Sequence, residues 1–182
     1  MMLSKIVHLA HVLGFPWVHH TGVKRQPAGE SGWKEQREAM SEENKTLARR
    51  WADIFNEGNL DLVDEIYAPD YVDHDPTMPE DVRGVEGARE FYSMYRSAFP
   101  DTEITIEDQV AEGDTVATRW TARGTHQGEL MGVPPSGNRV EVMGVTISRI
   151  EGGKIVEEWD IYDALGMMQA IGAVPEQEPA GS

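Results

Sequence analysis

The spacing of apolar residues changes at Thr102, from a helical period to a period of two that continues to Ile161. Successive side chains of a strand point to opposite faces, so this alternation predicts a run of β-strands. Two short turn sequences interrupt the run, Glu112-Gly113-Asp114 and Glu151-Gly152-Gly153, and both are typical of hairpins. Helices followed by antiparallel strands predict an α+β domain, with the helices packed on one face of the sheet.

The part of the chain before Thr102 has the spacing of helices. We expect a helix over residues 41–57 with Ser41 as its N-cap, a shorter helix over residues 60–68, and a third over residues 84–99. A strongly twisted sheet wrapped around an amphipathic helix leaves an apolar cone that is open at one end. Such a cone is a natural site for a small molecule.

The length of 182 residues suits one domain, which we place at residues 40–175. Residues 1–39 are Gly- and Pro-punctuated in their second half, and we interpret them as a disordered or loosely attached extension. Met40 directly precedes the first expected helix and would serve as a natural start of the protein. We therefore interpret part of residues 1–39 as an upstream mis-start or an added segment. Residues 176–182 are expected to form a disordered tail.

The formal net charge of -16 argues against nucleic acid as a partner, since phosphates repel such a surface. No apolar run is long enough to span a bilayer, so we expect no membrane association. The absence of cysteine excludes disulfides, thiolate metal sites and a cysteine nucleophile, and it fits a cytoplasmic location. The dense carboxylates also raise the hypothesis of a high-salt habitat.

The segment from Lys154 to Gly172 begins as a strand and ends as a helix, with Asp163 at the changeover. Strand alternation places Asp163 with Trp159 and Ile161 on the face that we expect to cover the cavity. Two roles are open for Asp163: an N-cap of the last helix, or a base whose pKa is raised by an apolar cavity. Asp160 and Tyr162 then fall on the opposite face, where we expect surface or dimer contacts.

Two histidines, His74 and His126, lie at strand edges and are candidate hydrogen-bond donors to a carbonyl or enolate oxygen. As isolated residues, both are equally well explained as structural histidines. Together with Asp163 they offer zinc ligand types, but separations of 52 and 37 residues match no compact metal motif, so we expect no metal. Aromatic residues at inward positions are candidate substrate contacts, although such residues commonly form a core: Trp51, Phe55, Tyr92, Tyr95, Trp120 and Trp159.

Four groups of residues together resemble the SnoaL-like polyketide cyclase, or ester cyclase, family of the nuclear transport factor 2-like superfamily. They are His74-Asp75-Pro76; Phe99-Pro100-Asp101; Gly124-Thr125-His126 with the loop through Gly137; and Glu158-Trp159 with Asp163 and the segment from Gln169 to Gly172. The resemblance covers roughly residues 41–175 and implies a cone-shaped, cystatin-like fold. This fold has N-terminal helices on a curved antiparallel sheet and a short C-terminal helix.

The resemblance implies an enzyme that closes polyketide rings by intramolecular aldol condensation without cofactor or metal. An aspartate near the last strand is the acid/base of such enzymes, and by likeness this is Asp163, with His74 and His126 polarising oxygen. The sequence departs from the family at Gln169-Ala170, where the family often has two glutamines. This departure bears on the end of the pocket or on helix packing.

We therefore expect a cofactor-independent enzyme that acts on a small apolar carbonyl compound, by aldol-type cyclisation or isomerisation. One alternative is a protein that binds such a compound without chemistry. Another is an epoxide or ester hydrolase, which needs a second carboxylate such as Asp75 and a pocket arginine. The face of the strands that points away from the expected cavity could contact a second copy of the chain, which suggests a homodimer.

Overall fold

The computed structural model describes residues 30–174. The expectations for residues 1–29 and 176–182 lie outside this range. Among the described residues, 34–174 belong to one compact unit, and of the other unit only the first turn of a helix, residues 30–33, is described. The domain bounds of 40 and 175 stay a prediction.

The first described helix, α2, spans Glu30–Ala48 and begins earlier than the sequence suggests. Ser41 lies inside α2 and is not an N-cap, so the expectation of a helix over residues 41–57 is wrong in its bounds. The segment before Ser41 is rich in Glu, Lys, Gln and Arg, which favour helix at solvated positions. A pair of this kind, Lys34 and Glu38, lies one turn apart with 3.7 Å between Nζ and Oε1.

A turn at Arg49-Arg50 separates α2 from α3 (Trp51–Asn56), and α4 (Leu62–Ile66) follows. The turn redirects the chain so that Trp51 and Ile54 are buried in the core. None of the helices within residues 30–174 is long and apolar enough to cross a membrane.

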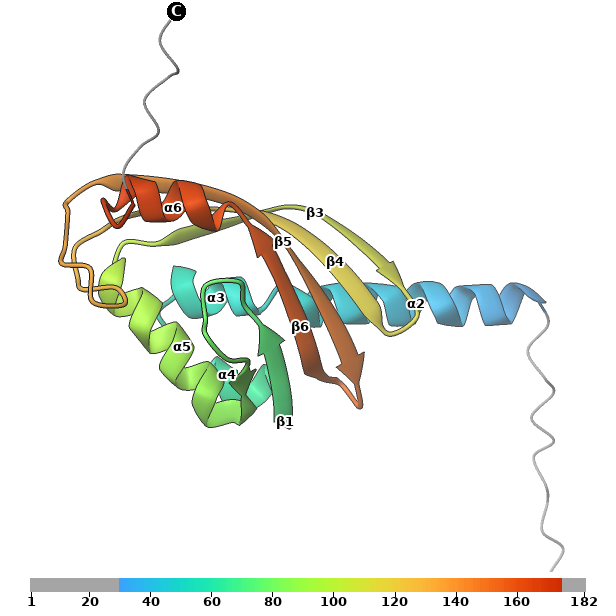
Figure 1. Cartoon of the computed structure of the whole chain (residues 1–182). Helices are drawn as coiled ribbons and strands as arrows, with labels where there is room; N and C mark the ends of the chain where they lie inside the picture. The colour runs from blue at the N-terminus through green and yellow to red at the C-terminus, as the bar shows by residue number, and fades with distance from the viewer. Residues whose placement is uncertain (1–29, 175–182) are drawn as a thin grey trace, which may run out of the picture. The chain divides into compact units, whose positions relative to one another are not determined.

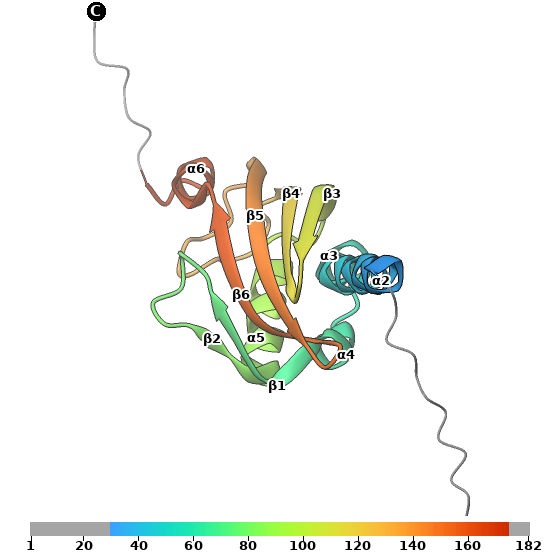
Figure 2. The ribbon, with the colours of Figure 1, turned by 90° about the vertical axis from the view of Figure 1, so that its right-hand side faces the viewer.

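Six strands form one curved sheet in the order β2-β1-β6-β5-β4-β3 (Figures 1 and 2). Their bounds are β1 Tyr67–His74, β2 Val82–Arg83, β3 Glu103–Glu112, β4 Thr115–Thr125, β5 Arg139–Glu151 and β6 Lys154–Tyr162. All neighbouring pairs are antiparallel except β1 and β6, which run parallel. The predicted α+β class and the two hairpins at residues 112–114 and 151–153 are confirmed.

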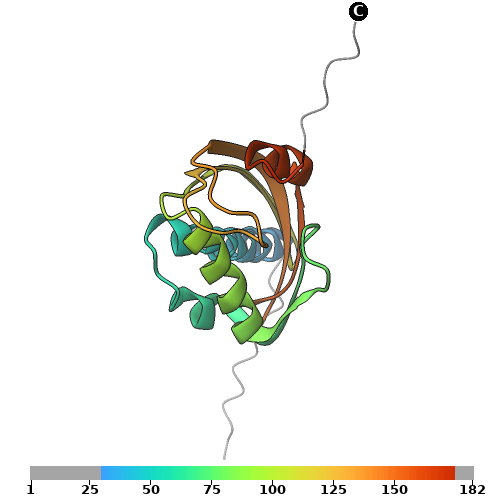
Figure 3. The same cartoon turned by 60° about the vertical axis from the view of Figure 1, so that its left-hand side comes forward.

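The helix α5 (Gly84–Ala98) lies across the concave side of this sheet, as Figure 3 shows. It buries Ala88, Tyr92 and Ala98 there. The short helix α6 (Ala164–Ala170) follows β6 and buries Met167. Together the helices and the sheet enclose the cone that the sequence predicts.

A β-bulge near the start of β6 decides which of its side chains face the cone. Arg149 pairs with Glu157 while its neighbour Ile150 pairs with Ile155, so Val156 is an extra residue on β6. One extra residue reverses the alternation beyond it. Trp159 and Ile161, 36% and 62% exposed, therefore lie on the outer face, and the expectation that they face the cavity is wrong.

Candidate functional site

The concave side of the sheet holds a cavity of about 120 Å³ with mainly apolar walls. Five of the six aromatic residues chosen from the sequence line it: Trp51, Phe55, Tyr92, Tyr95 and Trp120. Their contact with a substrate stays a prediction. The sixth, Trp159, lies on the outer face of the sheet.

Edge-to-face contacts hold the aromatic wall in place. The rings of Trp51 and Trp120 have centroids 5.8 Å apart at 77°, and those of Phe55 and Tyr92 are 5.4 Å apart at 65°. These arrangements suit the quadrupoles of the rings and restrict their rotation. The rings therefore form an apolar surface of fixed shape.

Asp160 is the carboxylate that a chain of hydrogen bonds holds in the cavity wall. The indole Nε1 of Trp120 donates to Oγ1 of Thr146 at 2.9 Å, and the Thr146 hydroxyl donates to Oδ1 of Asp160. An indole N–H can only donate, which sets the direction of the first bond, and the Thr146 hydroxyl is left with its own proton for an ionised Asp160. Thr146 and Asp160 lie directly opposite each other on β5 and β6, which explains their contact.

A glycine makes room for this chain. Gly144 of β5 lies opposite Trp120, and a Cβ atom at position 144 would lie 2.5 Å from Cζ2 of the indole. Any larger residue would displace the Trp120 ring and with it the Nε1 donor. The close approach of ring and backbone requires glycine here.

The surroundings of Asp160 favour its protonated form at neutral pH. Its pKa is raised to about 8, chiefly because the cavity removes it from bulk water and then because of the charge of Glu158. The hydrogen bond from Thr146 acts in the opposite direction. A carboxyl group with a pKa near the working pH can both take up and return a proton.

A second polar group lies in the same wall and consists of hydroxyls around Asp75. The Tyr162 hydroxyl donates to both oxygens of Asp75, at 3.2 and 3.1 Å, and Thr77 donates through its backbone N at 2.7 Å. The hydroxyl oxygens of Tyr95 and Tyr162 are 3.3 Å apart. Burial raises the pKa of Tyr95 to about 12, so this phenol keeps its proton and remains a donor.

Asp163, the acid/base expected from the resemblance, lies outside the cavity. It is exposed, and its Oδ1 accepts a hydrogen bond of 2.8 Å from the backbone N of Gly166, at the start of α6. This is the N-cap role that the sequence left open. The expectation that Asp163 faces the cavity is wrong, because the bulge at Val156 turns Asp160 inward instead.

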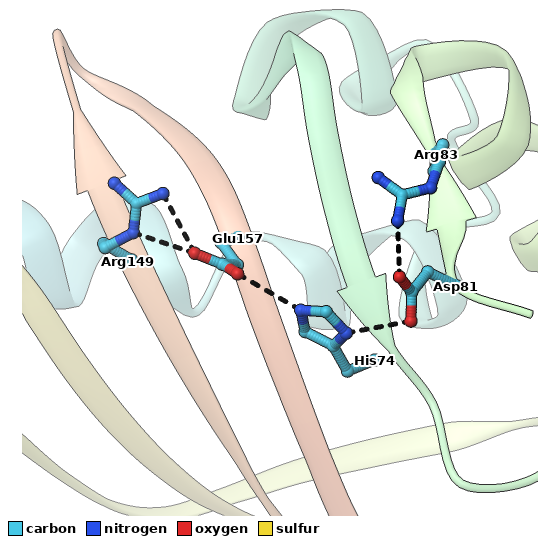
Figure 4. A network of polar contacts seen from close by, with 5 residues as sticks. All are labelled: His74, Asp81, Arg83, Arg149 and Glu157. Carbon is cyan, nitrogen blue, oxygen red and sulfur yellow. Dashed lines mark hydrogen bonds and ion pairs between the residues drawn. The ribbon is translucent and has the colours of Figure 1, made fainter.

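His74 lies on the outer face, in the network of Figure 4. Its Nδ1 is 2.9 Å from Oδ1 of Asp81, its Nε2 is 3.1 Å from Oε1 of Glu157, and its ring stacks on Trp159 at 5.5 Å. Arg149 completes the network by donating to Glu157 at 2.9 Å. This histidine therefore does not face the cavity, contrary to expectation.

The two carboxylates around His74 predict a pH-dependent contribution to stability. The hydrogen bond to Glu157 raises the pKa of His74 above 6.5, so His74 stabilises the fold fully below pH 6.5 and less as the pH rises through its folded value. We expect the melting temperature of His74→Gln to lie about 2–4 °C below wild type at acidic pH, since a partly exposed pair contributes at most about 1 kcal/mol. The difference should shrink at alkaline pH. An equal difference at both pH values would contradict this assignment.

His126 is fully buried beside the loop that follows β4. Its Nδ1 accepts a hydrogen bond of 3.2 Å from the backbone N of Ser136, and its ring packs on Phe99 at 5.2 Å. Its Nε2 has no hydrogen-bond partner among residues 30–174. His126 is not among the residues that line the cavity, which favours the structural role.

The structure thus keeps His74, His126 and Asp163 in separate surroundings. Across the described range, no three His, Cys, Asp or Glu side chains gather in a way that could hold a metal ion. Sequence reasoning missed Asp160, Thr146 and Tyr162 as cavity residues. Strand alternation without a bulge had placed Asp160 and Tyr162 on the surface or dimer face, and the bulge at Val156 reverses this.

Comparison with known proteins gives one consistent family. Residues 45–171 match the model of the SnoaL-like polyketide cyclases. The aklanonic acid methyl ester cyclase DnrD of Streptomyces peucetius is 29% identical over 141 residues, which are 74% of this chain and 94% of that protein. The nogalonic acid methyl ester cyclase of Streptomyces nogalater is 30% identical over 123 residues, 65% of this chain and 89% of its own.

Solved structures agree with this result. A candidate SnoaL-like polyketide cyclase from Jannaschia sp. CCS1 superimposes with a TM-score of 0.67 at 28% identity, covering 82% of this chain and 99% of its own. IdmH of Streptomyces antibioticus, a candidate polyketide cyclase, has a TM-score of 0.60 at 37% identity, covering 71% and 98%.

Proposed function

The chain belongs to the SnoaL-like polyketide cyclase family, and we propose that it closes a carbon ring by intramolecular aldol addition, with Asp160 as its acid/base. The substrate class is a neutral, largely apolar polyketide ester. Two relatives are named for methyl esters, and the carboxyl groups of this cavity wall oppose the entry of a free carboxylate. Asp160 in the aromatic wall carries the proposal.

The reaction has two proton steps. The carboxylate of Asp160 takes a proton from a carbon that lies between two carbonyl groups, and the resulting enolate carbon attacks a ketone carbon of the same molecule. The new C–C bond converts the ketone into an alkoxide, which recovers the proton from the Asp160 carboxylic acid. Atoms and charge balance, and the product has the mass of the substrate.

The other wall residues support these steps. The aromatic rings exclude water, so the enolate is not quenched from solvent and the reacting ends stay close together. The hydroxyl of Tyr95 is a donor in the same wall, where it can stabilise the developing negative oxygen. Thr146 keeps one oxygen of Asp160 in place, which aims the carboxylate.

The pH dependence of turnover tests this assignment. Only ionised Asp160 can act as base, so we expect kcat for a methyl ester such as aklanonic or nogalonic acid methyl ester to rise with pH and level off above a midpoint near 8. Stopped-flow absorbance and mass spectrometry follow the reaction. A profile without a rise between pH 6 and 9, or a product heavier by one water, would contradict the proposal.

A further inference from the structure

Four acidic side chains lie close to one another where β1 pairs with β6. Asp73 and Asp75 come from β1 and the residue after it, and Glu158 and Asp160 come from β6. Asp73 lies opposite Glu158 in the parallel register, and Asp160 is the next inward residue along β6. Within residues 30–174, none of the four forms an ion pair with a basic side chain.

Several buried negative charges without a cation are too costly to persist, so part of this cluster must hold protons. The hydrogen bonds indicate which carboxyl group holds a proton. Three of the carboxyl groups accept from neighbouring groups: Asp75 from Thr77 and Tyr162, Glu158 from Tyr71 and Ser148, and Asp160 from Thr146. Asp73 is only 3% exposed, and its Oδ1 is a buried atom without a partner among the described residues.

Donors stabilise a carboxylate, and an oxygen without donors favours the neutral acid. The titratable groups whose charges act on Asp73 are Asp75, Tyr67 and Tyr71 of its own segment, Glu158 and Asp160 of β6, and Tyr92 of α5, together with Asp81, which bonds to His74 on the outer face. All are acidic or phenolic. Burial, followed by the charges of Asp160 and Glu158, raises the pKa of Asp73 to about 10.

We propose that Asp73 is a positioning residue for Asp160, a neutral carboxylic acid that holds its proton beside the base and offers it an O–H donor. The inference rests on the proposed function, in which Asp160 is the base. An ionised Asp73 would add a further buried negative charge and oppose the ionisation of Asp160. A neutral Asp73 adds no charge and stabilises the carboxylate that must form.

Infrared spectroscopy tests this without any substrate. At about pH 9 Asp160 is mostly ionised and Asp73 is not, so the wild-type protein should keep the C=O band of Asp73. Burial also raises the pKa of Glu158, so a band of Glu158 is identified separately by its loss in Glu158→Gln. Asp73→Asn should lack that band. The band that titrates near pH 8 is assigned by its loss in Asp160→Asn. If the spectrum of Asp73→Asn keeps every carboxylic acid band of the wild type, the proposal is overturned.

The midpoint of the Asp160 band gives a second readout. We expect Asp73→Asn, which keeps a donor and no charge, to leave this midpoint unchanged, and Asp73→Leu, which removes the donor, to raise it. A lower midpoint in Asp73→Asn would mean that Asp73 is ionised, and an unchanged midpoint in a folded Asp73→Leu would mean that it does not act on Asp160. Either result overturns the proposal. If Asp73→Leu does not fold, the Asp73 band and the Asp160 midpoint in Asp73→Asn still test the proposal.

These spectra also separate the two proposals. Failure to turn over the methyl esters would count against the ring-closing function and leave the spectra of Asp73 intact. A wild-type spectrum without the Asp73 band, together with normal turnover, would overturn only the role of Asp73.

Discussion

Replacing Asp160 with asparagine is expected to lower kcat for ring closure by about 10²- to 10⁴-fold, the usual contribution of a general base. Asparagine has nearly the same shape and can still accept the hydrogen bond from Thr146 through its amide oxygen, so the cavity should keep its form. The affinity for the substrate, which depends on the aromatic wall, should change little. Steady-state kinetics on a methyl ester, with a binding measurement by fluorescence or calorimetry, separates the two effects.

Asp163→Asn is the matched control, because it makes the same chemical change three residues along the chain. Asparagine caps a helix about as well as aspartate does, so the stability of α6 should also be preserved. We expect turnover close to that of the wild type. If Asp163→Asn were the inactive variant and Asp160→Asn the active one, the assignment from the structure would be reversed.

Replacing Gly128 with alanine is expected to destabilise the domain by about 2–4 kcal/mol, because two segments of backbone meet there without space for a side chain. A Cβ atom at position 128 would lie 2.1 Å from the carbonyl oxygen of Ser97, at the end of α5. Hydrogen bonds from the backbone N atoms of Gln127 and Gly128 to the oxygen of Ala98, 2.9 and 3.0 Å long, hold this approach. The melting temperature should fall by roughly 5–15 °C.

Gly87→Ala is the control for this variant. Gly87 lies inside α5, and the nearest atom to a new Cβ there is a side-chain carbon of Val82 at 3.3 Å, which can adjust. Alanine favours a helix over glycine by about 1 kcal/mol, so this variant should be at least as stable as the wild type. Gly128→Ala melting at the wild-type temperature would show that the loop at Gly128 can move away from α5.

Local signals predicted most of the secondary structure correctly. The hairpins at residues 112–114 and 151–153, the helix near residues 84–99 and the strands from Thr102 onward depend on spacing and turn residues that are visible in a short window. The start of α2 was missed because the segment before Ser41 lacks an apolar stripe and is helical through its charged residues. The short strand β2 and the parallel pairing of β1 with β6 depend on contacts between distant segments.

The site was predicted less well than the fold. Five aromatic cavity residues could be chosen because large inward side chains of helices and strands meet in the core of any cone. The acid/base candidate was placed on Asp163, since both the alternation of apolar residues along β6 and the family resemblance led to it. Apolar residues on the outer face, Trp159 and Ile161, imitated a core-facing pattern and shifted the choice by three positions.

By itself the sequence determined the α+β class, the family and the aromatic character of the cavity, because period, turn residues and motif order are properties of the chain. Only the tertiary structure decided which carboxylate enters the cavity. The reason is one extra residue, Val156, which reverses every side chain beyond it on β6. Thr146, which donates to Asp160, and Trp120, which donates to Thr146, come from strands that meet only in the folded sheet.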